Sequence, residues 1–135
     1  RTGQRAPSEV EGWTREGIIE YLGQTRDVRP YVADASVVVL PSWREGTPCS
    51  VMEGMSMGRA AVVTDAPGCR EVVEDGVNGF RVPLRDPEAL AAAMERFIAD
   101  RSLIARMGQA GRRLAETEFD ADKVSEHILR VMRLA

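Results

Sequence analysis

The stretch from residue 36 to residue 58 constrains the fold of this chain most. Residues 37–40 read Val-Val-Val-Leu, a continuous apolar run typical of a parallel strand that is covered on both faces. A Pro-Ser pair ends the run, and residues 47–57 predict a helix. Thr47 is the expected N-cap and Pro48 the first helical residue, where no amide hydrogen is missed, and a glycine ends the helix. A strand, a polar loop and a helix in this order indicate an α/β corner.

The predicted start of this helix is a favourable place for an anion. Amide hydrogens without a partner and a partial positive charge attract phosphate groups above all. Gly46 lies in the preceding loop and has no Cβ, so a ligand can approach the backbone there. In open α/β sheets, ligands bind beyond the carboxyl ends of the strands, which is where this loop lies. Taken alone, an ordinary corner without a ligand explains these features equally well.

Two carboxylates favour a ligand site at this corner. Glu45 lies in the loop and Glu53 in the helix, eight positions later. Here the sequence resembles the family 4 glycosyltransferases of the GT-B fold, whose C-terminal domain carries a strand, Pro-Ser, Glu-Gly-x-Pro and a second glutamate at this spacing. The chain reads Pro-Ser-Trp-Arg-Glu-Gly-Thr-Pro over residues 41–48. The resemblance covers about residues 17–100, including the Asn-Gly turn at residues 78–79.

The resemblance implies an α/β fold, a Rossmann-like parallel sheet with flanking helices that forms the C-terminal half of a GT-B enzyme. We predict strands at about residues 18–22, 36–40, 60–64 and 79–82. Because the family's domain has two further strands, we expect residues 1–135 to be a partial nucleotide-sugar-binding domain that lacks its first β-α-β unit. That unit would lie in another part of a longer parent chain, or a second copy would fill the gap in a homodimer.

The resemblance also gives the two glutamates their roles. Glu45 is expected to meet hydroxyls of the donor sugar as the catalytic carboxylate, and Glu53 to bind the ribose of the nucleotide. A carboxylate suits the second role, because it accepts hydrogen bonds and a ribose diol offers two donors. Apolar neighbours predict that Glu53 is partly buried. The alternative for Glu53 is an ordinary glutamate on a helix surface.

Backbone and loop positions complete the expected site. By resemblance, the amides of Gly46, Thr47 and Cys49 face the diphosphate. The loop after the first predicted strand approaches the nucleotide base in the related family. Its candidates to contact the base are Gln24, Arg26 and Val28. Taken singly, Gln24 and Arg26 are better explained as solvated side chains and Val28 as a core residue, and we expect the loop to contact the base through its backbone.

Helical patterns follow these strands. Residues 68–71 are expected to begin a helix. Asp86 is the expected cap of a later one, and either Asp120 or Asp122 caps the last helix. Spacing by three and four residues predicts an inward face on that last helix, made of Val124, Ile128, Val131 and Met132.

Composition excludes several functions. The length of 135 residues suits one domain, and a formal net charge of −3 gives no indication of nucleic acid as a partner. The two cysteines lie twenty positions apart beside a single histidine, so we expect no metal site, and the family implies no cofactor. Free thiols suit the cytoplasm, and association of the parent with the inner membrane surface stays open. The chain does not begin with Met, and we expect a fragment.

Together these observations predict the donor-binding domain of a retaining glycosyltransferase. The closest motif matches are to bacterial enzymes of surface-polysaccharide synthesis, which implies a UDP-sugar donor and a lipid-linked or saccharide acceptor bound by an N-terminal domain. The fragment alone is expected to be inactive. The alternatives are a nucleotide-sugar epimerase of GT-B fold and a non-catalytic nucleotide-binding module. A nicotinamide-dependent dehydrogenase would carry Gly-x-Gly-x-x-Gly, which is not present.

Overall fold

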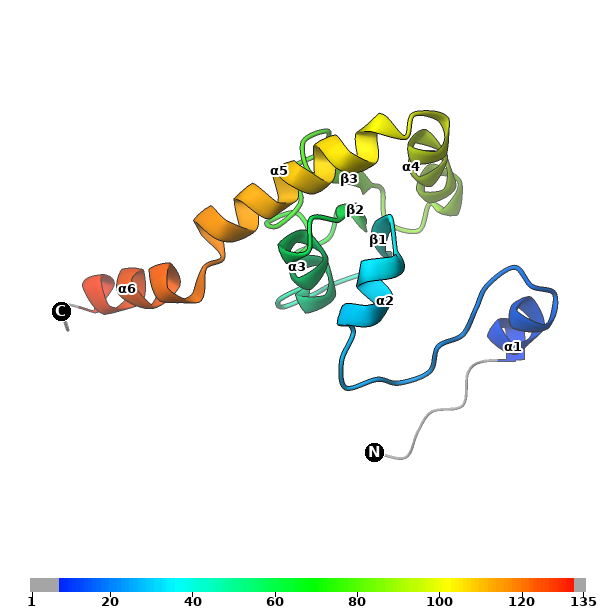
Figure 1. The fold of residues 1–135 in the computed structure, drawn as a ribbon, viewed down its shortest axis with the longest axis horizontal. Coiled ribbons are helices and arrows are strands. Elements are labelled where there is room, and N and C mark those ends of the chain that lie inside the picture. Colours follow the sequence, from blue (N-terminus) through cyan, green and yellow to red (C-terminus); the bar gives the residue numbers. More distant parts are fainter. Residues whose placement is uncertain (1–7, 133–135) are drawn as a thin grey trace.

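The computed structural model describes residues 8–132, and a three-stranded parallel sheet lies at its centre (Figure 1). The strands are β1 (Val37–Leu40), β2 (Ala60–Thr64) and β3 (Gly79–Val82), in the order β1-β2-β3. Val37 pairs with Ala60, and Ala61 with Gly79. The Rossmann-like α/β architecture and three of the four predicted strands are therefore confirmed.

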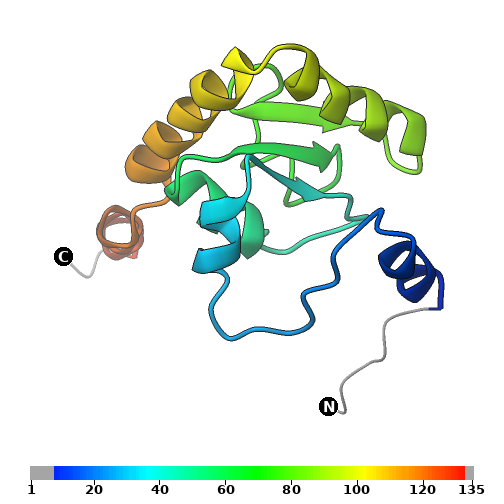
Figure 2. The same ribbon diagram turned by 45° about the vertical axis from the view of Figure 1, so that its right-hand side comes forward.

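Six helices accompany the sheet among the described residues. Helix α3 packs on one face and α4 on the other, while α5 runs across the amino end of β2 (Figure 2). The close approach of α5 needs a glycine, because a Cβ at Gly108 would overlap the Gly58 carbonyl oxygen. The helices are α1 (Ser8–Arg15), α2 (Arg29–Asp34), α3 (Cys49–Ser56), α4 (Pro87–Ala99), α5 (Ser102–Glu118) and α6 (Ala121–Val131).

The central strand β2 separates two hydrophobic clusters. All five of its residues are buried, and successive side chains point to opposite faces of the sheet. Ala61 and Val63 pack with α3, the 69–73 segment and Ala115 of α5. Ala60 and Val62 pack with β3, α4 and the first turns of α5. The sheet therefore holds the carboxyl ends of its strands, where the site was predicted, on a rigid core.

Helix α3 ends as predicted and begins one residue later than predicted. Gly58 has φ 73°, its amide donates to the Met55 carbonyl, and the next amide donates to the Gly54 carbonyl, which is a Schellman motif. Thr47 is not the N-cap. Pro48 takes that position without a side-chain hydrogen bond, and its carbonyl accepts the amides of residues 51 and 52.

The predicted strand at residues 18–22 is wrong. These residues are irregular and exposed, with Ile18 at 65% exposure, and they lie on a segment that swings away from the sheet between α1 and α2 (Figure 1). A strand needs a neighbouring strand for its amides and carbonyls. Within residues 8–132 no neighbour accompanies this segment, so its apolar composition alone does not make it a strand.

The helical part of the chain is predicted well except for its buried faces. Asp86 caps α4 through the Ala89 amide, and Asp120 caps α6 through the amides of Asp122 and Lys123, as expected. The expected inward face of α6 is wrong, because α6 extends beyond the sheet (Figure 1) and all of its side chains are exposed. Residues 68–71 form turns instead of starting a helix, since Gly68 has φ 88°.

Candidate functional site

Two loops meet at the carboxyl ends of β1 and β2. The Thr64 hydroxyl donates to the Ser42 carbonyl, and the Glu45 amide donates to the Pro67 carbonyl at 3.0 Å. Gly68 lies against the backbone of Glu45 so closely that a Cβ at residue 68 would overlap the Glu45 carbonyl oxygen. The loop after β2 therefore fixes the loop that leads into α3, and Gly68 serves this contact between loops.

The start of α3 offers amides without a partner. Within residues 8–132, the amides of Gly46, Thr47 and Ser50 donate no hydrogen bond, whereas the Cys49 amide donates to the Thr47 carbonyl at 2.9 Å. The Cys49 amide, which the sequence placed against a diphosphate, is thus engaged within the chain. In the described chain the amide of Ser50, the second residue of the helix, is free, whereas the Cys49 amide is not. The first amides of any helix have no partner within the helix, and this rule could have indicated Ser50 from the sequence.

A pocket of about 610 Å³ lies between the start of α2 and one side of α3. It brings together five of the eight predicted site residues, which are Arg26, Val28, Thr47, Cys49 and Glu53. Gln24 does not line it. The side chain of Glu53 is exposed on this pocket and makes no hydrogen bond in the described chain, so the expectation that it is partly buried is wrong.

The loop before α2 holds one arginine in an ion pair and leaves another without one. Asp27 accepts from the Arg29 amide and from its guanidinium, with a Nε–Oδ1 distance of 2.8 Å. The Arg29 guanidinium lowers the pKa of Asp27, chiefly through this side-chain hydrogen bond. Within residues 8–132 Arg26 has no acidic partner, and it lines the pocket. The pocket is therefore lined by one arginine without an ion pair in the described chain, together with Thr47 and Cys49 at the start of α3.

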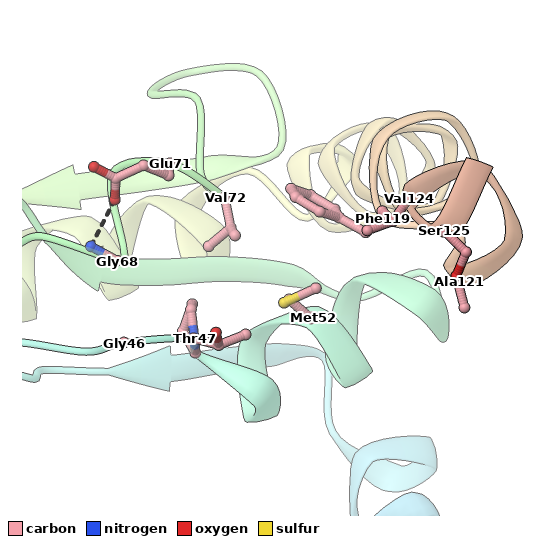
Figure 3. Close-up of a pocket in the computed structure, with 11 residues that line it drawn as sticks. Gly46, Thr47, Met52, Gly68, Glu71, Val72, Phe119, Ala121, Val124 and Ser125 are labelled. Atoms are coloured by element: carbon pink, nitrogen blue, oxygen red, sulfur yellow. Dashed lines mark hydrogen bonds between the residues drawn. The ribbon is translucent and has the colours of Figure 1, made fainter. Parts of the chain in front are cut away.

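A second pocket, of about 630 Å³, lies on the other side of the α3 start and shares Thr47 and Met52 with the first (Figure 3). Its walls are the 46–48 loop, the 68–72 segment, Phe119 and the start of α6. The Glu71 side chain accepts the Gly68 amide at 2.6 Å (Figure 3). One loop, residues 46–48, therefore borders two open pockets.

Glu45 is half-buried in the loop between β1 and α3 and lines neither of these two pockets. The thiol of Cys69 is fully buried nearby, and burial, followed by the charges of Glu45 and Glu71, raises its pKa. Glu45 therefore lies with Glu71 on the side of the loop that faces the 65–71 segment, while Glu53 lies on the α2 side.

Two structural features are absent from the described part of the chain. No three side chains of histidine, cysteine or acidic residues gather closely enough to hold a metal ion in residues 8–132. No helix in the same residues is both long and apolar enough to cross a lipid bilayer.

Comparison with known proteins gives the family. The model of the family described as "Glycosyl transferases group 1" matches residues 2–100. The chain belongs to this family. EpsD of Bacillus subtilis (strain 168), named as a glycosyltransferase, is 35% identical over 106 residues, which are 78% of this chain and 28% of that protein. LpsE of Rhizobium meliloti (strain 1021), a lipopolysaccharide core biosynthesis glycosyltransferase, is 28% identical over 86% of this chain and 34% of its own length.

Solved structures of glycosyltransferases share the fold of this chain. HepE of Anabaena, crystallised with UDP, superimposes with a TM-score of 0.86 at 25% identity, over 95% of this chain and 36% of its own. Sucrose-phosphate synthase of Thermosynechococcus elongatus gives a TM-score of 0.83 over 94% of this chain and 33% of its own. The chain therefore spans about a third of the length of these relatives, and its sheet corresponds to a part of their GT-B fold.

Proposed function

We propose that this chain forms the nucleotide-sugar donor site of a glycosyltransferase, with a UDP-sugar as the donor. The observation that carries the proposal is the start of α3. The amides of Gly46, Thr47 and Ser50 there have no partner within residues 8–132, and Thr47 lines a pocket of about 610 Å³ together with Arg26 and Glu53. HepE, a structural neighbour, was crystallised in complex with UDP.

In this proposal the diphosphate lies against the amides of Gly46, Thr47 and Ser50. These donors and the helix dipole favour negative charge, and they favour it more as the bond to the sugar breaks and the leaving UDP gains charge. Arg26 adds a positive charge from the facing loop. No metal ion takes part in this arrangement, because amides and a cation stabilise the leaving group.

The two glutamates bind different parts of the donor, the ribose and the transferred sugar. Glu53 accepts hydrogen bonds from the ribose hydroxyls, since its carboxylate is exposed on the pocket. Glu45 faces the sugar from the junction of the two loops, where Gly68 holds its backbone. Val28, which lines the pocket, contacts the base, and Gln24, which does not line it, is the remaining candidate for the base.

The reaction we propose is transfer with retention of anomeric configuration to a lipid-linked or saccharide acceptor. The chain spans about a third of its relatives, so we place the acceptor site outside these residues. One relative, from Campylobacter jejuni, is named for transfer of N-acetylgalactosamine to a diphospho-undecaprenol-linked sugar and is 26% identical. The natural protein would work in the cytoplasm, at the inner membrane surface when its acceptor is a lipid.

Calorimetry of the intact natural protein with UDP, GDP and ADP tests the site. We expect UDP to bind most tightly and Glu53→Ala to weaken it about tenfold to a hundredfold, the effect of losing hydrogen bonds to a charged group. Glu95→Ala is the matched control, because Glu95 is equally exposed on α4 and lines neither pocket. Equal affinities in both variants would contradict the role of Glu53.

Binding of none of the three nucleotides would contradict the donor site as a whole. A protein that instead interconverts two UDP-sugars without an acceptor would be an epimerase. NMR spectroscopy of the transfer product shows whether its new glycosidic bond keeps the configuration of the donor, and an inverted product would contradict the proposed retention.

A further inference from the structure

The guanidinium of Arg59 joins the ends of two helices. Its Nε donates to the Val32 carbonyl at 3.0 Å and its Nη2 to the Ala33 carbonyl at 2.8 Å. Its Nη1 donates to the Met57 carbonyl at 3.0 Å. The first two carbonyls belong to the last turn of α2, and the third to the residue that caps α3. All three nitrogens of one side chain therefore bind main-chain oxygens.

These oxygens are suitable partners for a cation. The last carbonyls of a helix have no amide partner within the helix and carry partial negative charge, so an arginine there satisfies and stabilises them. The planar guanidinium can hold three such oxygens in one geometry, which the single ammonium of a lysine cannot reproduce. Arg59 makes no ion pair within residues 8–132, so these carbonyls are its partners.

The backbone of Arg59 is itself fixed. Its amide donates to the Gly54 carbonyl at 2.8 Å as part of the Schellman motif that ends α3. The next residue, Ala60, is fully buried and begins the central strand β2. The guanidinium therefore extends from backbone that is fixed between the end of α3 and the start of β2.

On the other side, α2 has few other attachments. None of its side chains is buried. Among the described residues, the two bonds from Arg59 to Val32 and Ala33 are the hydrogen bonds that join residues 8–35 to the rest of the chain. Both views show α2 beside α3 (Figures 1 and 2), and the 610 Å³ pocket lies between the start of α2 and α3. The position of α2 therefore determines the width of that pocket, because residues 26–29 form one of its walls.

We propose that Arg59 is a positioning residue that holds the wall of the donor pocket formed by residues 26–29 at its distance from α3. Arg59 touches no ligand. It acts by fixing the C-terminal end of α2, a helix of only six residues. Because α2 is short, this also fixes the positions of Arg26 and Val28 across the pocket from Glu53. The expected effect of Arg59 on UDP affinity rests on the proposed function. Its expected effect on the position of α2 rests on the hydrogen bonds alone.

Hydrogen–deuterium exchange of the intact natural protein without ligand tests the structural half. In Arg59→Lys and Arg59→Gln we expect the amides of Val32 and Ala35, which close the turns of α2, to exchange about tenfold faster, with β2 unchanged. Arg101→Gln is the control, because Arg101 is an exposed arginine beside the same surface and its side chain makes no hydrogen bond in the described chain. Unchanged exchange of α2 in both Arg59 variants would overturn the inference.

A double-mutant cycle tests the binding half. We expect Arg59→Lys to weaken UDP binding about tenfold and to reduce the preference for UDP over GDP and ADP. Arg26→Ala should weaken binding in the natural protein and add little in the Arg59→Lys background, because the wall that carries Arg26 is already displaced. Full additivity of the two effects would overturn the inference, since a general loss of stability would leave the effect of Arg26 intact.

The results separate this inference from the proposed function. If the natural protein binds UDP and Glu53→Ala weakens it, but Arg59→Lys binds as tightly as the natural protein, the donor site stands and the role of Arg59 is wrong. If no nucleotide binds the natural protein, the donor site is wrong and the binding half of this inference falls with it, whatever the exchange rates of α2.

Discussion

Cys49 and Cys69 show how differently two residues of one type are placed around the site. Cys69 is fully buried, and burial beside the carboxylates of Glu45 and Glu71 raises the pKa of its thiol. Because the thiolate is the reactive form, Cys69 stays protonated and unreactive near neutral pH. Cys49 is exposed at the start of α3 and lines the pocket proposed for the nucleotide.

This contrast predicts a labelling pattern. A maleimide should modify Cys49 in the native protein and leave Cys69 unmodified until the protein is unfolded in denaturant. Saturating UDP should slow the labelling of Cys49 about tenfold or more, because the ligand covers the pocket wall. Mass spectrometry of peptides measures both sites, and inorganic phosphate alone serves as the ligand control. Labelling of Cys49 at the same rate with and without UDP would contradict the placement of the nucleotide.

Single residues at the site were predicted to different degrees. The glutamate spacing and the resemblance to the family motif made Glu45, Gly46, Thr47 and Glu53 candidates, and their roles in binding stay predictions. The exposure of Glu53 was not predictable, because it depends on the pocket that lies between α2 and α3. Nor was the role of Arg59, because all three of its partners are backbone atoms and two of them, in Val32 and Ala33, lie far away in sequence.

Among the structural elements, the two loops at the carboxyl ends of β1 and β2 depend on each other. Gly68 has φ 88°, and its missing Cβ leaves room for the Glu45 carbonyl. Gly46 has an ordinary φ, and a Cβ there would meet no protein atom within 4 Å. The fold therefore requires a glycine at position 68, whereas the space beside Gly46 is free of protein atoms in the described part of the chain.

Alanine substitutions at the two glycines should therefore differ. Gly68→Ala should lower the free energy of unfolding by about 2 kcal/mol or more, since it combines a left-handed conformation with a backbone overlap. Gly46→Ala should change that free energy by no more than about 0.5 kcal/mol and still weaken UDP binding, because its methyl group occupies space proposed for the ligand. Denaturant unfolding measures the first effect and calorimetry the second. Equal stability of the two variants would contradict this account of the loops.

Elements were predictable where their signals are local. The strand at residues 37–40, the glycine that ends α3 and the aspartate caps of α4 and α6 all follow from short-range chemistry, although this strand is half-buried at the sheet edge and not covered as expected. The apolar segment at residues 18–22 and the apolar residues of α6 were assigned to a strand and to a core from periodicity, and both lie exposed. Periodicity shows that a face is apolar, but a partner in three dimensions decides whether it is buried.

For the whole molecule, the sheet and its two hydrophobic clusters form a platform that presents the start of α3. The chain spans about a third of its relatives, and its three strands match a part of the sheet in their GT-B fold. The expected further β-α-β unit of the domain, in a longer parent chain or supplied by a second copy, remains our proposal. In the described residues only β2 pairs on both sides, and β1 is the edge where such a unit would add.

The most direct test of the central claim is the structure of the intact natural protein bound to UDP. We predict that phosphate oxygens lie about 3 Å from the amide nitrogens of Gly46, Thr47 and Ser50. We also predict that the ribose hydroxyls lie within hydrogen-bond distance of the Glu53 carboxylate. A diphosphate bound away from the start of α3, or a ribose that Glu53 does not contact, would contradict the account.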